Sequence, residues 1–255
     1  MKITYIHHSS FLVELESVYL LFDYTEGTIP GMKREKPLLV LASHRHGDHY
    51  SPVIFDLIKE HGNVWFVLSN DIWRKRLPEE VRPLTDSLKH GETAKYRLEN
   101  GIIRQLTGTP ENQIEDGVIS DACLTIHTYK STDEGVAFLI EAEGKTIYHA
   151  GDLNNWRWEG EPDNWNDSMA KKYSAQIDKM AGMHLDVAFL PLDPRHEDDF
   201  YLGMDEFLHK VDVKHVFPMH CWGDYSVIGK IRALGCSAGY RDRIEEITGD
   251  GEGFT

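Results

Sequence analysis

Residues 39–52 read Leu39-Val40-Leu41-Ala42-Ser43-His44-Arg45-His46-Gly47-Asp48-His49-Tyr50-Ser51-Pro52. The apolar run from Pro37 to Ala42 predicts a buried strand. Ser51 and Pro52, ahead of a further apolar pattern, predict a helix with serine as its N-cap and proline at its first position. The potential metal ligands between them therefore lie on a strand-to-helix turn.

His44, His46 and Asp48 occupy alternate positions of this turn. In an extended backbone, residues at even spacing point the same way, so these side chains can converge while Arg45 points elsewhere. His49 follows Asp48 directly, so its side chain points in a different direction, which allows a short loop to supply ligands to two adjacent metal ions. Residue frequencies make H-x-H-x-D-H rare by chance, so a metal site is favoured over an accidental histidine-rich loop. Imidazole and carboxylate ligands suit zinc, with manganese and iron as alternatives.

Composition limits the class of partner. The chain has 255 residues, 41% of them hydrophobic, which is enough for a large core in one or two domains. Its formal charge of -15 argues against a nucleic-acid surface, which needs clustered lysine and arginine. We expect a small-molecule substrate, and an anionic one would need a local basic pocket.

The cysteines and the N-terminus bear on compartment. Cys123, Cys221 and Cys236 are odd in number and lack C-x-x-C spacing, so a disulfide framework is not expected. The first residues have no signal-like apolar core, and no apolar run approaches membrane-spanning length. We therefore expect a cytoplasmic protein that does not bind membranes.

The opening segment, residues 1–24, predicts a hairpin followed by a more buried strand that ends at Asp23. Asp23 could orient a ligand histidine, since such carboxylates fix the imidazole tautomer. His8 could approach the metal loop, but beside Ser9 and Ser10 in a turn a structural role is the favoured interpretation.

From Cys123 the pattern starts over with a second hairpin, and three further strands end in polar side chains. Thr146–Ala150 leads to Gly151-Asp152, 186–191 leads to Asp193 and Arg195, and 215–219 leads to His220. Two halves that each open with a hairpin predict an α/β (α+β) protein in which two mixed sheets pack face to face with helices outside. The ligand-bearing loops would then meet along one edge.

These motifs, in this order, resemble the metallo-β-lactamase superfamily, a four-layer αββα sandwich. The resemblance covers nearly the whole chain and implies a single domain over residues 1–255. A narrower and less specific resemblance, to the branch that includes the L-ascorbate-6-phosphate lactonases, rests on Ser131–Gly135 and His149–Asn154.

The resemblance implies a ligand set. In the order of the family motifs, the first metal would be held by His44 and His46, the second by Asp48, His49 and His220, with Asp152 bridging. One or two ions per chain follow, with zinc as the leading metal.

One expected ligand is missing, because Ser131 stands where the family has a histidine. His127, His149 and Asp133 are candidates to replace it, and for both histidines a structural role is favoured. Cys221 could be a ligand or a reactive thiol, but it neighbours His220 on a strand and so faces the other way, which favours a buried structural role.

An insertion at residues 153–182 begins beside Asp152 and is longer than an ordinary connection, so it could cover the pocket. Trp156 and Trp158 then contact substrate or, equally, pack a helix onto the sandwich. Arg157 and Arg195 are candidates to bind an anionic group, and Lys130 is a third.

The function implied is hydrolysis of a small, anionic ester, lactone or phosphoester by a metal-bound hydroxide, with Asp48 or Asp152 orienting the nucleophile and passing its proton to the leaving group. Three alternatives remain: a nuclease, which the charge disfavours, an iron-dependent redox enzyme of the same fold, and a non-catalytic metal-binding or small-molecule-binding protein. A homo-oligomer would be unsurprising.

Overall fold

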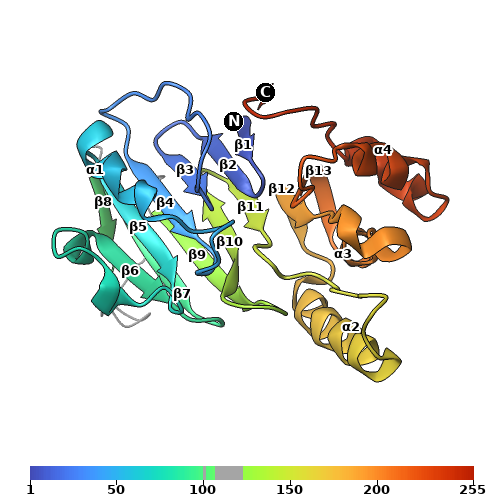
Figure 1. Ribbon diagram of the computed structural model, residues 1–255. Coiled ribbons are helices and arrows are strands. Elements are labelled where there is room, and N and C mark those ends of the chain that lie inside the picture. Colours follow the sequence, from blue (N-terminus) through green and yellow to red (C-terminus); the bar gives the residue numbers. More distant parts are fainter. Residues whose placement is uncertain (100–101, 107–122) are drawn as a thin grey trace.

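The computed structural model describes residues 1–99, 102–106 and 123–255, whose strands form two mixed sheets of seven strands each (Figure 1). In order across the first sheet these are β14 (Gly253–Phe254), β1 (Lys2–His7), β2 (Ser10–Glu14), β3 (Tyr19–Phe22), β4 (Leu38–Ala42), β5 (Val64–Ser69) and β6 (Thr85–Leu88). Across the second they are β13 (Asp212–Met219), β12 (His184–Pro191), β11 (Lys145–His149), β10 (Val136–Ala142), β9 (Cys123–Lys130), β7 (Thr93–Glu99) and β8 (Ile102–Gln105). The predicted pair of mixed sheets is confirmed.

Helices cover the outer face of each sheet, which completes the four layers (Figure 1). The first sheet carries η1 (Pro52–Asp56), which continues into α1 (Leu57–Glu60). The second carries α2 (Asp163–Ile177), α3 (Leu202–Lys210) and α4 (Ser226–Ala233). The described residues also contain short 3₁₀ turns: η2 (Arg74–Arg76), η3 (Arg82–Leu84), η5 (Asp178–Met180), η6 (Pro194–Asp199), η7 (Cys236–Gly239) and η8 (Arg241–Arg243).

The continuous apolar run of β4 is explained by burial on both faces. Leu39 and Leu41 point into the core between the two sheets, whereas Leu38 and Val40 pack under η1 and α1. Every residue of β4 is buried. Parallel strands covered on both sides have this composition, because neither face meets water.

The helix after the metal loop begins as predicted but in a tighter form. The Ser51 side chain accepts a hydrogen bond from the Val53 backbone N–H, and Pro52 is the first helical residue. The first five residues are 3₁₀, and only four α-helical residues follow.

Parallel strand pairs bring the polar strand ends together. In the first sheet β3, β4 and β5 run parallel, and in the second β11, β12 and β13 do the same. Their carboxyl ends carry Asp23, the metal loop, Asp152, Asp193 and His220. In the described ranges, no helix is long and apolar enough to cross a bilayer.

Candidate metal centre

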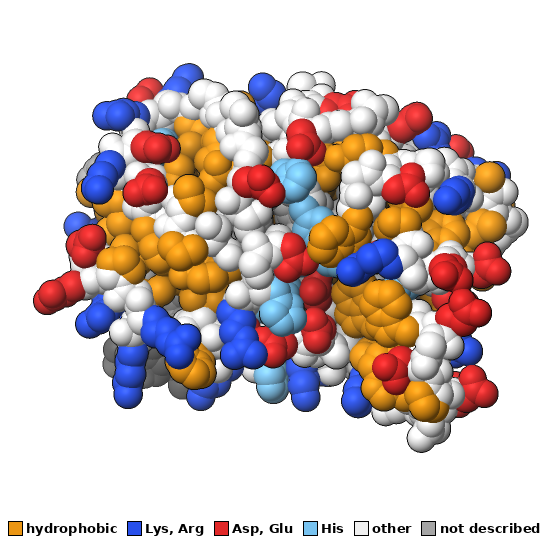
Figure 2. Space-filling model, viewed as in Figure 1, with side chains coloured by type: hydrophobic (Ala, Val, Ile, Leu, Met, Phe, Trp, Pro, Cys, Tyr) orange, Lys and Arg blue, Asp and Glu red, His pale blue; other side chains and the backbone are white. Residues whose placement is uncertain are grey.

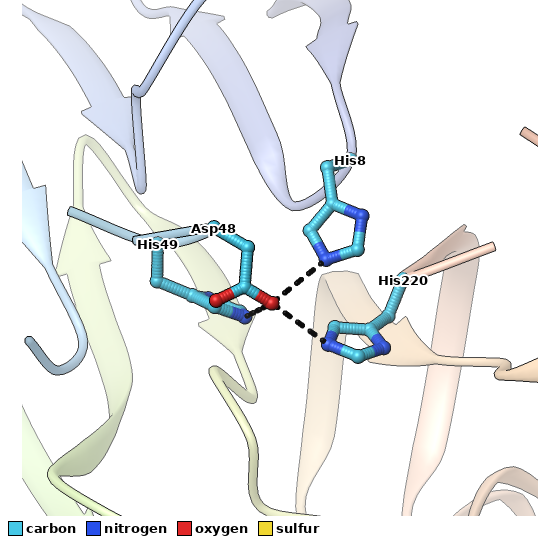
Figure 3. A group of neighbouring side chains, drawn as sticks. All are labelled: His8, Asp48, His49 and His220. Carbon is cyan, nitrogen blue, oxygen red and sulfur yellow. Dashed lines mark ion pairs between the residues drawn. The ribbon is translucent and has the colours of Figure 1, made fainter. Parts of the chain in front are cut away.

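Two groups of histidine and aspartate side chains meet where the two sheets' strand ends converge. One contains His8, Asp48, His49 and His220, and the other contains His44, His46 and Asp152. Within each group, one ligand atom from every residue lies within 4.8 Å of the others. Figure 3 shows the first group, in which Oδ2 of Asp48 faces the imidazoles. The six residues predicted as metal ligands are therefore brought together.

Asp152 lies between the two groups. Its Oδ1 is 3.1 Å from Nε2 of His49 and 3.6 Å from Nε2 of His220. Its Oδ2 is 3.3 Å from Nε2 of His44, in the other group. One carboxylate thus faces both groups with different oxygens, which is the placement that a bridging ligand needs.

His8 is the residue for which sequence reasoning favoured the wrong environment. It lies in the β1–β2 turn, but the side chain is buried and its Nε2 is 3.5 Å from Oδ2 of Asp48 (Figure 3). Its ring lies 4.3 Å from that of His220. The position next to serines in a turn concealed this, because the approach of the β1–β2 turn to the end of β13 is a tertiary contact.

Three side chains behind the ligands hold the imidazoles in place. Asp23 accepts a hydrogen bond from Nδ1 of His49 (2.7 Å), as predicted for this carboxylate. Asp193 accepts one from Nδ1 of His220 (2.9 Å), a role that the sequence analysis missed. In each case the carboxylate fixes the proton on Nδ1 and leaves Nε2 as the free ligand atom. Nδ1 of His44 is 3.0 Å from the Ser43 hydroxyl.

The backbone is strained at the same place. His8, Asp23, His220 and Trp222 have φ values of 51°, 44°, 63° and 51°. Non-glycine residues pay for this left-handed conformation, and such strain concentrates at functional sites because the surrounding structure must enforce it.

The donor atoms fit metal ions. His49 Nε2 and Asp152 Oδ1 are buried and lack a hydrogen bond of acceptable geometry among the described residues, although they are only 3.1 Å apart, and Nε2 of His8 is also unsatisfied. Buried polar atoms are rarely left in this state. In the other group, Nε2 of His44 and Nδ1 of His46 are 3.0 Å apart and share a hydrogen bond. Converging imidazoles and carboxylates of this kind are the ligand set that zinc, manganese or iron takes.

The electrostatics of the two groups suit a cation. Burial opposes ionisation of Asp48, yet the imidazoles of His220 and His8, 3.6 and 3.5 Å from its Oδ2, hold the pKa of its carboxyl well below the usual range. Burial also opposes charge on His49, yet the Asp152 and Asp23 carboxylates raise the pKa of this imidazole well above its ordinary value. Without metal, protonated imidazoles balance the carboxylates, and a bound cation would replace these protons.

Neither His127 nor His149 replaces the ligand histidine for which Ser131 stands. The His127 ring is beside the Thr93 hydroxyl at 2.8 Å, away from both groups. His149 is fully buried, stacks on Phe22 and lies 2.9 Å from the Ser9 carbonyl oxygen. Both therefore have the structural surroundings that the sequence favoured.

Asp133 is the candidate that faces the site. Its Oδ2 lies 3.6 Å from Nδ1 of His46, and the side chain lines the cavity in front of the metal groups. Burial and the neighbouring Asp152 carboxylate raise its pKa. Ser131 accepts a hydrogen bond from the Asp133 backbone N–H and so shapes this turn.

A cavity of about 350 Å³ opens onto the metal groups. Its walls include residues that the sequence singled out, Trp156, Trp158 and Arg195, together with Trp165 and Trp222. The start of the insertion thus borders the cavity, while its helix α2 packs beside α3 through a hydrogen bond from the Tyr173 hydroxyl to the Gly203 carbonyl.

Two predicted residues lie elsewhere. Arg157 does not line this cavity, because its guanidinium pairs with Asp199 at 3.0 Å. Its assignment to substrate is therefore corrected: sequence adjacency to Trp156 does not set the direction of a side chain in an irregular loop. Cys221 is buried, and burial raises the pKa of its thiol to about 12, which suits the structural role.

A second cavity, of about 500 Å³, lies on the other side of Trp222. Its lining includes Tyr5, His8, Glu26 and Tyr225 and contains no lysine or arginine among the described residues. Asp48 and Trp222 border both cavities. The metal groups can therefore be approached from two sides.

Comparisons with known proteins agree with this geometry. A family model described as a Beta-lactamase superfamily domain matches residues 2–161. A UPF0173 metal-dependent hydrolase of Desulforamulus reducens is 28% identical over 230 residues, which are 86% of this chain and 84% of that protein. A UPF0173 metal-dependent hydrolase of Thermus thermophilus is 25% identical over 98% of this chain and 94% of its own.

Among solved structures, a metallo hydrolase from the archaeon Ignicoccus hospitalis superimposes with a TM-score of 0.58 at 18% identity, over 99% of this chain and 97% of that one. This likeness concerns the fold. The family model, in contrast, spans more than half of the sequence and reaches from the first hairpin through Gly151-Asp152. The chain therefore belongs to the metallo-β-lactamase superfamily.

Proposed function

We propose that the protein is a metal-dependent hydrolase of a small, anionic ester, lactone or phosphoester. The observation that carries the proposal is the pair of ligand groups joined by Asp152, in which buried atoms of His8, His49 and Asp152 lack hydrogen-bond partners among the described residues. The names of the relatives from Desulforamulus and Thermus agree with it. Zinc is the proposed metal, with manganese and iron as alternatives.

The ligands would divide between two ions. His8, Asp48, His49 and His220 would hold one, His44 and His46 the other with help from Asp133, and Asp152 would face both. Bound ions would polarise the scissile carbonyl or phosphoryl group and make water acidic enough to attack at neutral pH.

The chain's own groups then direct the reaction. Asp48 is about one third exposed and borders both cavities, so it can take a proton at Oδ1 from the attacking water and deliver it to the leaving group. Asp23 and Asp193 keep the imidazoles in the tautomer that leaves Nε2 free. Arg195 lines the cavity and is the proposed contact for an anionic group.

Lactones are one substrate type within this proposal. The narrower resemblance to the L-ascorbate-6-phosphate lactonases favours them, and it rests on the Ser131–Gly135 and His149–Asn154 segments alone. Lactones, esters and phosphoesters therefore form one panel of test substrates.

Metal content and turnover test the proposal together. The protein, purified without added metal, would be analysed for zinc, manganese and iron and assayed on the panel before and after chelation. We expect one or two ions per chain and activity that is lost on chelation and restored by metal. His49→Ala and Asp152→Asn should lower both metal content and turnover, whereas His127→Ala, outside the site, should lower neither.

Three results would overturn this function. Absence of metal after reconstitution would remove its basis, and activity that survives chelation would remove the role of the metal. Iron together with oxygen consumption would instead identify a redox enzyme. Unchanged metal content and turnover in His49→Ala and Asp152→Asn would refute the ligand assignment.

A further inference from the structure

Aromatic side chains line much of the cavity in front of the metal groups. Four of the chain's six tryptophans line it, namely Trp156, Trp158, Trp165 and Trp222. Figure 2 shows histidines running down the middle of this face, with hydrophobic side chains and a basic side chain directly beside them. Such a concentration of indoles at the mouth of a polar site calls for a ligand with a matching surface.

Arg195 is the basic residue of this cavity, and it is held rigidly. Its guanidinium lies 4.4 Å from the ring centre of Trp222 and 5.6 Å from that of Trp158, so it sits beside two indoles at once. Its Nε and Nη2 donate to the buried carboxylate of Asp193 at 3.0 and 2.6 Å. Within the described residues Nη1 has no hydrogen-bond partner, and nearly half of the side chain is exposed.

Asp193 connects this arginine to the metal site. The carboxylate that fixes Arg195 also accepts hydrogen bonds from Nδ1 of His220 and Nε1 of Trp222. It is shared among three donor side chains, those of Arg195, His220 and Trp222, so it positions Arg195 while leaving Nη1 of the guanidinium for a ligand. A group bound at Nη1 is therefore held at a fixed position relative to the metal ligand His220, because the buried Asp193 side chain contacts both residues.

Charge and shape select the ligand. Three carboxylates, those of Asp48, Asp133 and Asp152, also line the cavity. In the metal-bound protein the ions would balance these carboxylates, so an anion is complementary to the ions and to Arg195, whereas a cationic group is not. Indole faces and edges favour a planar ring, because offset and edge-on aromatic contacts are stronger than the contacts of a puckered ring of the same size. Trp156 and Trp158 stack on each other, with ring centres 6.4 Å apart and planes 7° apart. Trp156 is buried, so Trp158 presents the more accessible ring of this pair.

We propose that the substrate carries an aromatic ring with an anionic substituent, bound with the ring against these indoles and the anion at Arg195. This inference rests on the proposed hydrolase function and names the substrate class for it. The scissile bond is then held over the two ligand groups, and the second cavity beyond Trp222 is left for the remainder of the molecule.

Fluorine NMR of the protein labelled with 5-fluorotryptophan tests the binding directly. The probe is benzoate, added to metal-free protein so that the carboxylate cannot bind to metal. We expect the resonances of the four cavity tryptophans to shift and those of Trp65 and Trp73, which do not line the cavity, to stay. Cyclohexanecarboxylate, equal in charge but puckered, should bind about 3- to 10-fold more weakly, and uncharged benzamide about 10-fold more weakly.

A matched pair of variants isolates the arginine. Arg195→Gln should weaken benzoate binding about 10-fold. Arg76→Gln should leave it unchanged, although Arg76 lies over Trp73 at 4.2 Å in a similar contact outside the cavity. The inference would be overturned if cyclohexanecarboxylate bound as tightly as benzoate, or if Arg195→Gln left the affinity for benzoate unchanged.

The outcome is separable from that of the proposed function. A protein that binds metal and hydrolyses the panel but shows no benzoate-dependent shifts would overturn the aromatic assignment alone. Benzoate binding that fits the prediction, in a protein that takes up no metal, would overturn the hydrolase and keep the ligand class.

Discussion

Replacing Asp23 with asparagine should separate the support of the metal site from the site itself. The buried carboxylate accepts hydrogen bonds from the Ser43 backbone N–H at Oδ1 (2.7 Å), and from the Ser43 hydroxyl (2.6 Å) and His49 Nδ1 (2.7 Å) at Oδ2. An asparagine oxygen must stay on the Ser43 N–H, because two donors would otherwise face each other. The new amide NH₂ then takes the place of Oδ2 and faces His49.

The consequence is a change of tautomer. His49 can accept a hydrogen bond from the amide at Nδ1 only if its proton moves to Nε2, the atom that points toward Asp48 and Asp152. A protonated Nε2 cannot bind metal. A lost hydrogen bond to a charged group is worth about 1.5–3 kcal/mol, which corresponds to about a 10- to 100-fold loss of metal affinity.

Calorimetric titration of the metal-free variant with zinc, or competition with a chelator, measures this loss. Asp186→Asn is the matched control, because Asp186 also accepts from a backbone N–H, that of Thr146, and from a side chain, Lys145, but lies outside the metal site. Wild-type zinc affinity in Asp23→Asn, with the fold intact by circular dichroism, would refute the idea that Asp23 sets the tautomer of His49.

Further predictions concern the loops and the protons of the site. Gly135→Ala should lower the melting temperature well below that of Gly144→Ala. Both glycines have φ near +70°, but of the two only Gly135 would place a Cβ against the backbone, 2.1 Å from the Ser43 carbonyl oxygen. Equal melting temperatures of the two variants would contradict this. Although burial opposes charge, neighbouring carboxylates raise the pKa values of His49 and His220 in the metal-free protein, so metal must displace protons there. Metal affinity should therefore fall as the pH falls through those values, with a binding heat that depends on the buffer, and a pH-independent affinity would count against it. Asp133→Asn should reduce the metal content of a two-ion protein toward one ion per chain by elemental analysis, and two tightly held ions would show that this carboxylate is not a ligand.

Much of the fold could be predicted because it follows from patterns within short segments of the sequence. The apolar run of β4 ends at the H-x-H-x-D-H loop, and a buried strand of this kind requires cover on both faces. The second half contains the expected hairpin, which turns at Glu143-Gly144, where both residues have positive φ. Asp23 was recognised as a support because it ends a buried strand, and β3 pairs with β4 in parallel, which places it beside Ser43.

The sequence by itself determined the ligands that share a short segment and the order in which the others follow, because alternation along a strand and the end of a strand are local properties. Only the tertiary structure decided that His8 joins the site, that Asp193 ties His220 to Arg195, and that Arg157 turns away to Asp199. Each of these depends on which loops become neighbours when the two sheets pack. Periodicity sets the direction of a side chain relative to its own backbone, whereas the distance between separate loops follows from the packing of the whole core.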